Sequence, residues 1–157
     1  MAEEMPPCED WTSVHIYMKL VNAVAKVSGR VFVGPTLCRD KDYLDAAVNY
    51  TLDIVGAQRK IQDMRPWLRP FLAPRLKEVR TIDSRKEKAR KLIAPIVQAR
   101  REAEKNDPRY KKPEDMMQWL MDRYSASGND SIDTLAQSQL GLIFAAIHTT
   151  TLTATNM

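Results

Sequence analysis

The stretch SIDTLAQSQLGLIFAAIHTTTLTATNM, residues 131–157, decides the fold class of this protein. It begins with amphipathic spacing, and from Leu140 to Ile147 apolar side chains cover the whole circumference of the predicted helix. A helix that is apolar all round belongs in the middle of a larger protein, where neighbouring elements cover it. We therefore expect a central helix in an all-α protein, with neighbours that this chain supplies only in part.

The remaining sequence predicts four more helices. Only 5 glycines are present, and β-branched residues are spread thinly among good helix formers. The apolar spacing predicts helices over residues 11–28, 40–62, 75–105 and 114–124. Candidate N-caps are Asp10 or Thr12 for the first helix, and Asn129, Asp130 or Ser131 for the last.

Prolines mark the expected interruptions of these helices. Gly34-Pro35 is a strong stop signal. The segment MRPWLRPFLAP, residues 64–74, holds three prolines and should form an irregular apolar connector. Pro95 should kink the third helix, or mark a junction between two helices.

The length of 157 residues and the mass of 18.0 kDa correspond to one domain with a real core. We expect residues 1–10 to be a flexible acidic N-terminus and residues 11–157 to form the domain. No stretch has the pattern of a signal peptide, and the longest apolar run is shorter than the roughly 20 residues of a membrane span. The sequence therefore predicts an intracellular protein without an anchor in this chain.

Few residues suit metal or nucleophilic chemistry. His15 and His148 lie far apart and lack the paired spacing of a zinc site, so no metal ligands are expected. Cys8 and Cys38 form no CxxC pair and are typical of reduced thiols. Because no base lies near Cys38 in the sequence, a buried cysteine is favoured over a nucleophile.

Basic side chains are concentrated between residues 74 and 112, where 14 Lys and Arg stand against 6 Asp and Glu. Such a cluster can bind the phosphates of a nucleic acid, but no aromatic side chains are interleaved to stack on bases. Glu87 with Lys91 and Asp83 with Lys86 have the spacing of ion pairs on a solvated helix. A solvated face is therefore favoured, and no nucleic-acid partner is expected.

The basic helix and the apolar connector also leave a non-enzymatic function open. Trp67, Leu68, Phe71 and Leu72 would form an adhesive patch if they are exposed. The chain would then be a helical interaction module that docks on a partner or on an anionic membrane through residues 64–105.

His148, Thr149, Thr150 and Thr151 form a polar cluster inside the apolar helix. Buried polar groups cost free energy unless they find partners. Threonine hydroxyls can bond to the carbonyl one turn back, which would make the cluster a benign distortion. Alternatively, the hydroxyls bend the helix open and offer a hydrogen bond to a bound ligand.

Several stretches, taken together and in their order, resemble a fungal cytochrome P-450. They are SGRVFVGPTLCRDKDYLDAAVNYTLDI (28–54), RPWLRPFLAP (65–74), RKLIAPIV (90–97) with RRE (100–102), and AAIHTTT (145–151). The resemblance covers nearly the whole chain from Trp11 onward. It implies a helical fragment corresponding to helices D to I of that fold, the last of them only in part. The HTTT pattern resembles a branch that contains terpenoid oxidases.

The resemblance implies the chemistry of a haem-dependent monooxygenase. Such enzymes use O2 and electrons from an NADPH-cytochrome reductase to oxidise a small hydrophobic substrate, here a terpenoid or other secondary metabolite, at the endoplasmic reticulum membrane. By resemblance, Thr149 and Thr150 form an oxygen-activating turn, and His148 stands where an acid is usual.

The resemblance also assigns residues to the substrate side of the site. Phe144 and Ala145 would lie beside the substrate on the central helix. Trp67 and Phe71 would line the entrance, with residues 64–74 in contact with the membrane surface.

Other parts of the family pattern are missing from this sequence. There is no F-x-x-G-x-R-x-C-x-G loop to supply the haem thiolate, because neither PPCED nor TLCRD resembles it. The only E-x-x-R, at residues 87–90, lies on the basic stripe and is discounted. We therefore expect a truncated middle portion of the family that binds no haem by itself and is inactive alone.

Overall fold

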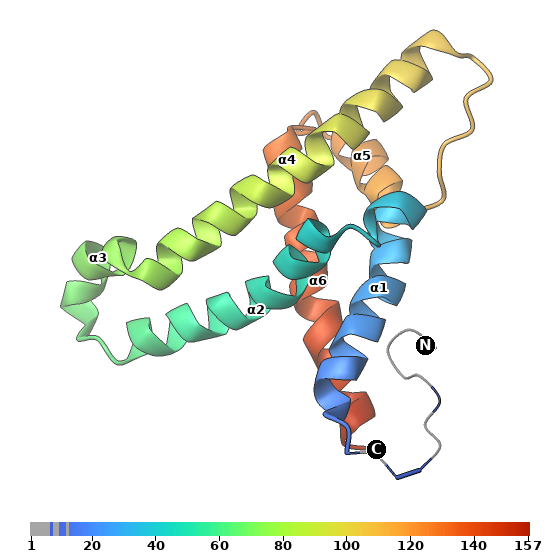
Figure 1. Cartoon of the computed structure of the whole chain (residues 1–157). Helices are drawn as coiled ribbons and strands as arrows, with labels where there is room; N and C mark the ends of the chain where they lie inside the picture. Colours follow the sequence, from blue (N-terminus) through green and yellow to red (C-terminus); the bar gives the residue numbers. More distant parts are fainter. Residues whose placement is uncertain (1–6, 8–9, 12) are drawn as a thin grey trace.

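The computed structural model describes residue 7, residues 10–11 and residues 13–157. The expected flexible N-terminus, residues 1–10, lies outside the described residues except for Pro7 and Asp10, as do Cys8 and the candidate cap Thr12. The described residues form six α-helices and no strand, which confirms the all-α prediction. The helices are α1 (Ile16–Leu37), α2 (Lys41–Gln62), α3 (Arg69–Leu72), α4 (Lys77–Asn106), α5 (Met116–Ala126) and α6 (Ile132–Thr155) (Figure 1).

The first helix begins and ends later than the sequence predicted. α1 starts after His15, which makes no side-chain capping bond, so the predicted Asp10 cap is wrong. The helix continues past Ser28 because its buried stripe continues at a spacing of four. That stripe consists of Val21, Ala25, Gly29, Val33 and Leu37. At Gly34 the backbone leaves helical geometry, with φ of 86° and ψ of −179°, so α1 consists of two helical pieces joined at a kink where the sequence placed a stop signal.

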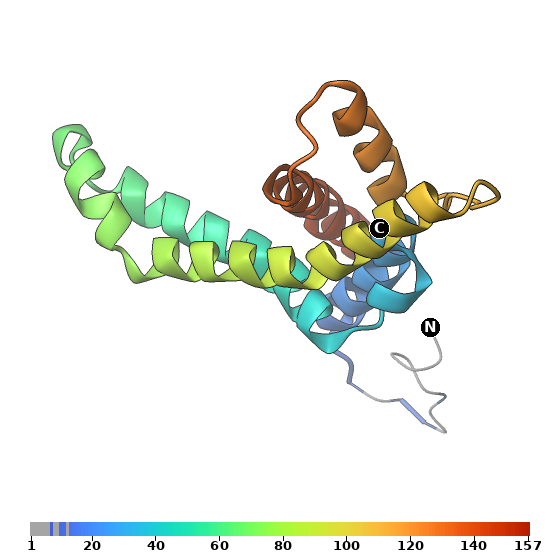
Figure 2. The same cartoon turned by 90° about the horizontal axis from the view of Figure 1, so that it is seen from above.

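Helices α2 and α4 pack side by side as an arm that projects from the rest of the molecule (Figures 1 and 2). α2 begins as predicted, because the Asp40 carboxylate accepts a hydrogen bond from the Tyr43 backbone N–H at 2.9 Å. Arg85 of α4 binds Asp45 and Asp53 of α2, which ties the two helices together. The arm carries the connector between them at its far end.

The connector is more regular than expected. Its residues form two single 3₁₀ turns, Pro66–Leu68 and Ala73–Arg75, around the one-turn helix α3. In each turn a proline occupies one of the first two positions, where its missing N–H would have had no partner anyway. The guanidinium of Arg69 donates to the carbonyls of Met64 and Gln62 and closes the segment on itself. The prediction of an irregular connector is therefore wrong.

α4 runs without interruption through Pro95, so it is a single helix and not two. Pro95 and Lys91 are both exposed. The Lys91 carbonyl, which loses its helical donor to the proline ring, can therefore bond to water. This is why the proline is tolerated in the helix interior.

α6 is the central helix, as the opening stretch predicted. It packs against α1, α2, α4 and α5, and Figure 2 shows it between α1 and α5. Ser131 is its N-cap, accepting from the Thr134 backbone N–H at 3.1 Å. One face of the helix lies in the core through Leu135, Ala136, Gln139, Leu140, Ile143, Ile147, His148 and Thr151. The opposite face is open, so this chain covers its central helix only in part.

Candidate functional site on the open face of α6

The polar cluster of α6 is divided between the two faces of the helix. His148 and Thr151 are buried, whereas Thr149 and Thr150 are exposed. Successive helical residues differ by about 100° around the axis, so neighbours in sequence point in different directions. The structure therefore separates His148 from the two threonines that the resemblance placed beside it.

The threonine hydroxyls bond along the helix. Thr149 Oγ1 donates to the Ala145 carbonyl at 2.5 Å, and Thr151 Oγ1 donates to the Ile147 carbonyl at 2.8 Å. α6 stays helical from Ile132 to Thr155, so these bonds are made without breaking it. After this donation, each hydroxyl oxygen still has lone pairs that can accept a hydrogen bond. Thr149 thus offers an acceptor on the open face.

The open face is mostly apolar and is built from small side chains along its middle. Gly141, Ala145 and Thr149 follow one another at a spacing of four, and all three are exposed. Phe144 is 40% exposed and Leu152 is 50% exposed beside them. The face therefore combines apolar contact area with the Thr149 hydroxyl.

Trp67 and Phe71 are far from this face. Both lie in the connector at the far end of the arm, where they are 66% and 68% exposed (Figure 1). They follow the end of α2 and precede the start of α4, and these two helix ends are far from α6. The structure thus brings together Phe144, Ala145 and Thr149, but it does not bring the two aromatic side chains of the connector to them.

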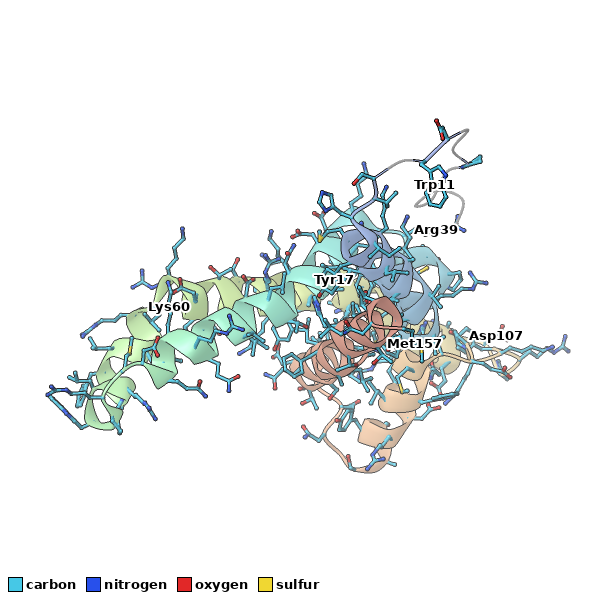
Figure 3. The ribbon with its side chains drawn as sticks, turned by 90° about the horizontal axis from the view of Figure 1, so that it is seen from below. Trp11, Tyr17, Arg39, Lys60, Asp107 and Met157 are labelled. Carbon is cyan, nitrogen blue, oxygen red and sulfur yellow. The ribbon has the colours of Figure 1, made fainter. Side chains whose placement is uncertain are left out.

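His148 has two hydrogen-bond partners in the core. Its Nδ1 lies 2.8 Å from the Tyr17 hydroxyl of α1, and its Nε2 lies 2.9 Å from the Val48 carbonyl of α2. The ring of Tyr17 is directed inward from α1 (Figure 3). Sequence reasoning missed Tyr17, because 131 positions separate it from His148 and no local pattern links them.

The basic stretch of α4 is largely paired with acids. The predicted pairs of Asp83 with Lys86 and Glu87 with Lys91 are present, at 3.4 Å and 3.6 Å. Arg90 also makes two hydrogen bonds to Glu87, both 2.7 Å long, and lowers the pKa of that carboxyl to about 2. These contacts confirm the predicted ion pairing along the solvated helix.

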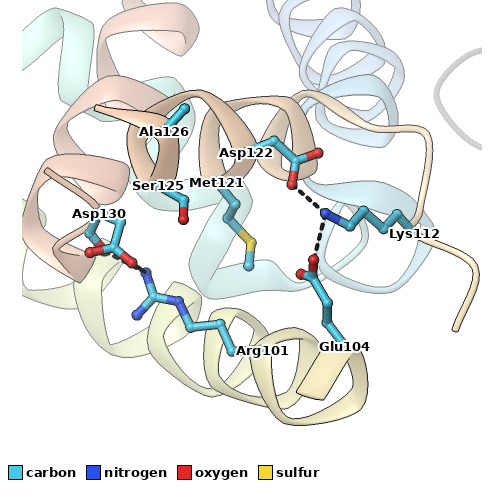
Figure 4. Close-up of a pocket in the computed structure, with 8 residues that line it drawn as sticks. All are labelled: Arg101, Glu104, Lys112, Met121, Asp122, Ser125, Ala126 and Asp130. Atoms are coloured by element: carbon cyan, nitrogen blue, oxygen red, sulfur yellow. Dashed lines mark hydrogen bonds and ion pairs between the residues drawn. The ribbon is translucent and has the colours of Figure 1, made fainter. Parts of the chain in front are cut away.

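A separate hollow on the surface lies between the end of α4 and α5 (Figure 4). It measures about 500 Å³, and each charged side chain that lines it contacts a side chain of opposite charge. Lys112 binds Asp122 at 2.8 Å and Glu104 at 2.7 Å, which raises the pKa of the lysine. Arg101 binds Asp130 at 3.0 Å. The hollow therefore presents no unpaired charge that would select a ligand.

Over the part of the chain that the structure describes, no three His, Cys, Asp or Glu side chains come close enough to hold a metal ion. Within the same residues, none of the helices is both long and apolar enough to pass through a bilayer.

Comparison with known proteins identifies the family of this chain. The family model of cytochrome P-450 matches residues 8–157, almost the whole chain. The chain belongs to the cytochrome P-450 family. No solved structure matches it at a significant level.

Similar proteins are fungal cytochrome P-450 monooxygenases. The monooxygenase ATR3 of Stachybotrys chlorohalonatus is 38% identical over 152 residues, which cover 97% of this chain and 32% of that protein. The monooxygenase olcJ of Penicillium canescens is 38% identical over 154 residues, covering 97% of this chain and 29% of its own length. The monooxygenase braC of Annulohypoxylon truncatum is 36% identical over 151 residues, which cover 95% of this chain and 30% of that protein. The chain thus spans about a third of the length of these curated relatives.

Members of the cytochrome P-450 family use haem and work with a redox-partner reductase and a substrate. In this chain, Cys38 is only 3% exposed, and its thiol donates to the Pro35 carbonyl at 3.3 Å. Cys8 lies outside the described residues. Cys38 is therefore enclosed in the core and does not fit the role of axial ligand.

Proposed function

We propose that this chain is part of a fungal cytochrome P-450 monooxygenase that oxidises a terpenoid or other secondary metabolite. The intact protein would use O2 and electrons from an NADPH-cytochrome reductase at the endoplasmic reticulum membrane. The observation that carries the proposal is the open face of α6. On that face Thr149 is exposed and bonds to the Ala145 carbonyl. The sequence resemblance assigns this threonine to the oxygen-activating turn of the family.

The side chains of the open face suit separate roles in that reaction. Thr149 supplies a hydroxyl that can accept and return a proton, and Thr150 supplies a second exposed hydroxyl one position on. Phe144 and Ala145 supply apolar contact for a hydrophobic substrate. Trp67 and Phe71, at the end of the arm, would meet the substrate or the membrane at the entrance of the intact enzyme.

We further propose that the 157-residue chain is inactive alone, because Cys38 is enclosed and cannot ligate haem. The test is to add haemin to the purified chain and to record the spectrum of the reduced carbon monoxide complex. We expect no thiolate-type band. A thiolate-type band from this chain would refute the proposal that it is inactive because it lacks a haem ligand.

The role of the open face is tested in a chimera. Residues 8–157 replace the matching segment of the Stachybotrys monooxygenase, and substrate oxidation is measured with its reductase. Thr149→Val should lower turnover by about 100-fold while haem content is unchanged, because a positioned proton-transfer group contributes on that order. Thr153→Val is the control, since this exposed hydroxyl bonds to the Thr149 carbonyl one turn further on. Equal turnover in both variants would overturn the assignment.

A second candidate function is a non-enzymatic module that docks through residues 64–105. The specific observation in its favour is the exposed apolar end of the arm, where Trp67, Phe71 and Leu72 lie together in the short turns of the connector. Such a surface would attach to an anionic membrane or to a partner without any haem chemistry.

A further inference from the structure

His148 joins three helices at one point. Its ring lies on α6, and its two nitrogens contact the Tyr17 hydroxyl of α1 and the Val48 carbonyl of α2 at 2.8 Å and 2.9 Å. The side chain is almost wholly enclosed, with 7% of the residue exposed. A buried polar group with all of its hydrogen-bonding positions filled holds its neighbours in one arrangement.

The identity of the partners fixes the tautomer of the neutral ring. The Val48 carbonyl can only accept a hydrogen bond, so Nε2 must carry a proton and donate it. In the neutral ring Nδ1 is then an acceptor, and the Tyr17 hydroxyl donates to it. The donor and the acceptor of each bond are therefore defined: Tyr17 donates to Nδ1 of His148, and Nε2 of His148 donates to Val48.

This arrangement determines which way α6 faces. If His148 is held between α1 and α2, α6 cannot turn about its axis without losing both bonds. Thr149 lies about 100° further round the helix and is consequently held on the open side, while Thr151 is held in the core. The apolar side chains on the inner face would resist rotation much less specifically, because apolar contacts are not directional.

We propose that His148 is a positioning residue, which through its bonds to Tyr17 and Val48 fixes the rotation of α6 and so directs the Thr149 hydroxyl to the open face. The histidine holds the helix in place from its buried face and is not a proton donor on the open face, where Thr149 lies. The use of that hydroxyl in oxygen activation rests on the proposed function. The orientation of the helix does not.

The test measures which side of α6 is open, in the whole 157-residue chain with Cys8→Ser as background. Cys38 stays in place, because its enclosure protects it from reagents. Thr149→Cys and Thr151→Cys are introduced separately, and the rates of reaction with a maleimide are compared. We expect the thiol at position 149 to react at least about tenfold faster than the thiol at position 151, whose native residue is fully enclosed.

Tyr17→Phe is then added to both chains. Loss of one hydrogen bond should reduce the ratio of the two rates by a factor of about 2 to 10. The matched control is Tyr124→Phe, because the Tyr124 hydroxyl also makes a 2.8 Å bond to α6, at Ser138. The control should leave the ratio unchanged. His148→Phe, which removes both bonds but keeps a ring, should reduce the ratio further if that variant folds.

A second measurement requires no introduced cysteine and no maleimide reaction. Long-range proton–nitrogen correlation spectra of the chain should show His148 protonated on Nε2 and not on Nδ1, and the Tyr17→Phe variant should weaken this preference. An unchanged rate ratio in Tyr17→Phe, an equal fall in Tyr124→Phe, or a ring protonated on Nδ1 would each overturn the proposal. None of these readouts requires haem or turnover, so the positioning role and the proposed function can fail separately.

Discussion

Arg100 and Asp115 form a buried, two-pronged ion pair, with guanidinium nitrogens 2.8 Å and 2.5 Å from the two carboxylate oxygens. Their side chains are only 10% and 5% exposed. The same carboxylate caps α5 by accepting from the Gln118 backbone N–H at 2.9 Å. One contact therefore joins the end of α4 to the start of α5, across a loop of irregular structure.

Removing one partner of this pair should be costly. Arg100→Met leaves the Asp115 carboxylate buried and unpaired, and we expect a loss of about 3–5 kcal/mol in the free energy of unfolding. Arg101→Met is the control, because its pair with Asp130 is far more exposed and should contribute no more than about 1 kcal/mol. Urea unfolding followed by circular dichroism gives both values. Similar losses in the two variants would contradict a buried pair.

Gly34 should resist substitution for two reasons. Its φ of 86° is unfavourable for any residue with a side chain, and an added Cβ would lie 3.0 Å from an Asp115 carboxylate oxygen. We expect Gly34→Ala to destabilise the chain by about 1–3 kcal/mol. Gly56→Ala in α2 is the matched control, with nothing within 4 Å of the added carbon, and should stabilise by about 0.4–1 kcal/mol. Thermal unfolding should therefore move in opposite directions for the two variants.

The pair of Glu87 with Arg90 should be visible in an acid titration. Hydrogen bonds from Arg90 lower the pKa of Glu87 from 4.5 to about 2. A depressed carboxyl pKa stabilises the folded chain above pH 4.5, and this contribution is lost as the pH falls from 4.5 towards 2. The carbon chemical shift of the Glu87 carboxyl should titrate with a midpoint near pH 2, and Arg90→Gln should raise this midpoint towards pH 4.5. Lys88→Gln should have little effect, because neighbours in sequence do not face each other on a helix.

The exposed end of the arm should bind lipid. Trp67→Ser with Phe71→Ser removes two side chains that are about two-thirds exposed, and binding to vesicles rich in phosphatidylserine should fall at least about tenfold. Trp119→Ser is the control, because Trp119 is 56% exposed on α5, away from the arm. Vesicle sedimentation at low and high salt measures the effect. A larger fall in the Trp119 variant would place the lipid contact elsewhere.

The open face of α6 should cause the isolated chain to associate. Phe144→Gln combined with Leu152→Gln replaces two exposed apolar side chains, and we expect less light scattering at the same concentration. Val27→Gln with Val31→Gln on α1 is the comparison, since both are also exposed apolar residues on a helix. If only the α1 variant lowers scattering, the α6 face does not drive association.

Much of the helical layout follows from local sequence. The starts of α2 and α6 are set by Asp40 and Ser131, whose side chains bond to backbone N–H groups three residues later. Local rules were less reliable where several features competed. Proline signals suggested an irregular connector, and a kink or a junction between two helices at Pro95. The connector prolines instead occupy the first positions of short turns, and α4 continues through Pro95 as one helix.

By itself, the sequence determined the helical class, the central position of α6 and the family resemblance, because these depend on apolar spacing and on motifs in chain order. Only the tertiary structure decided which way the polar cluster faces. His148 is turned inward by Tyr17 and Val48, and Thr149 is thereby left on the open side. The partners come from helices 131 and 100 positions away in the chain, and contacts at such separation form only when the helices pack.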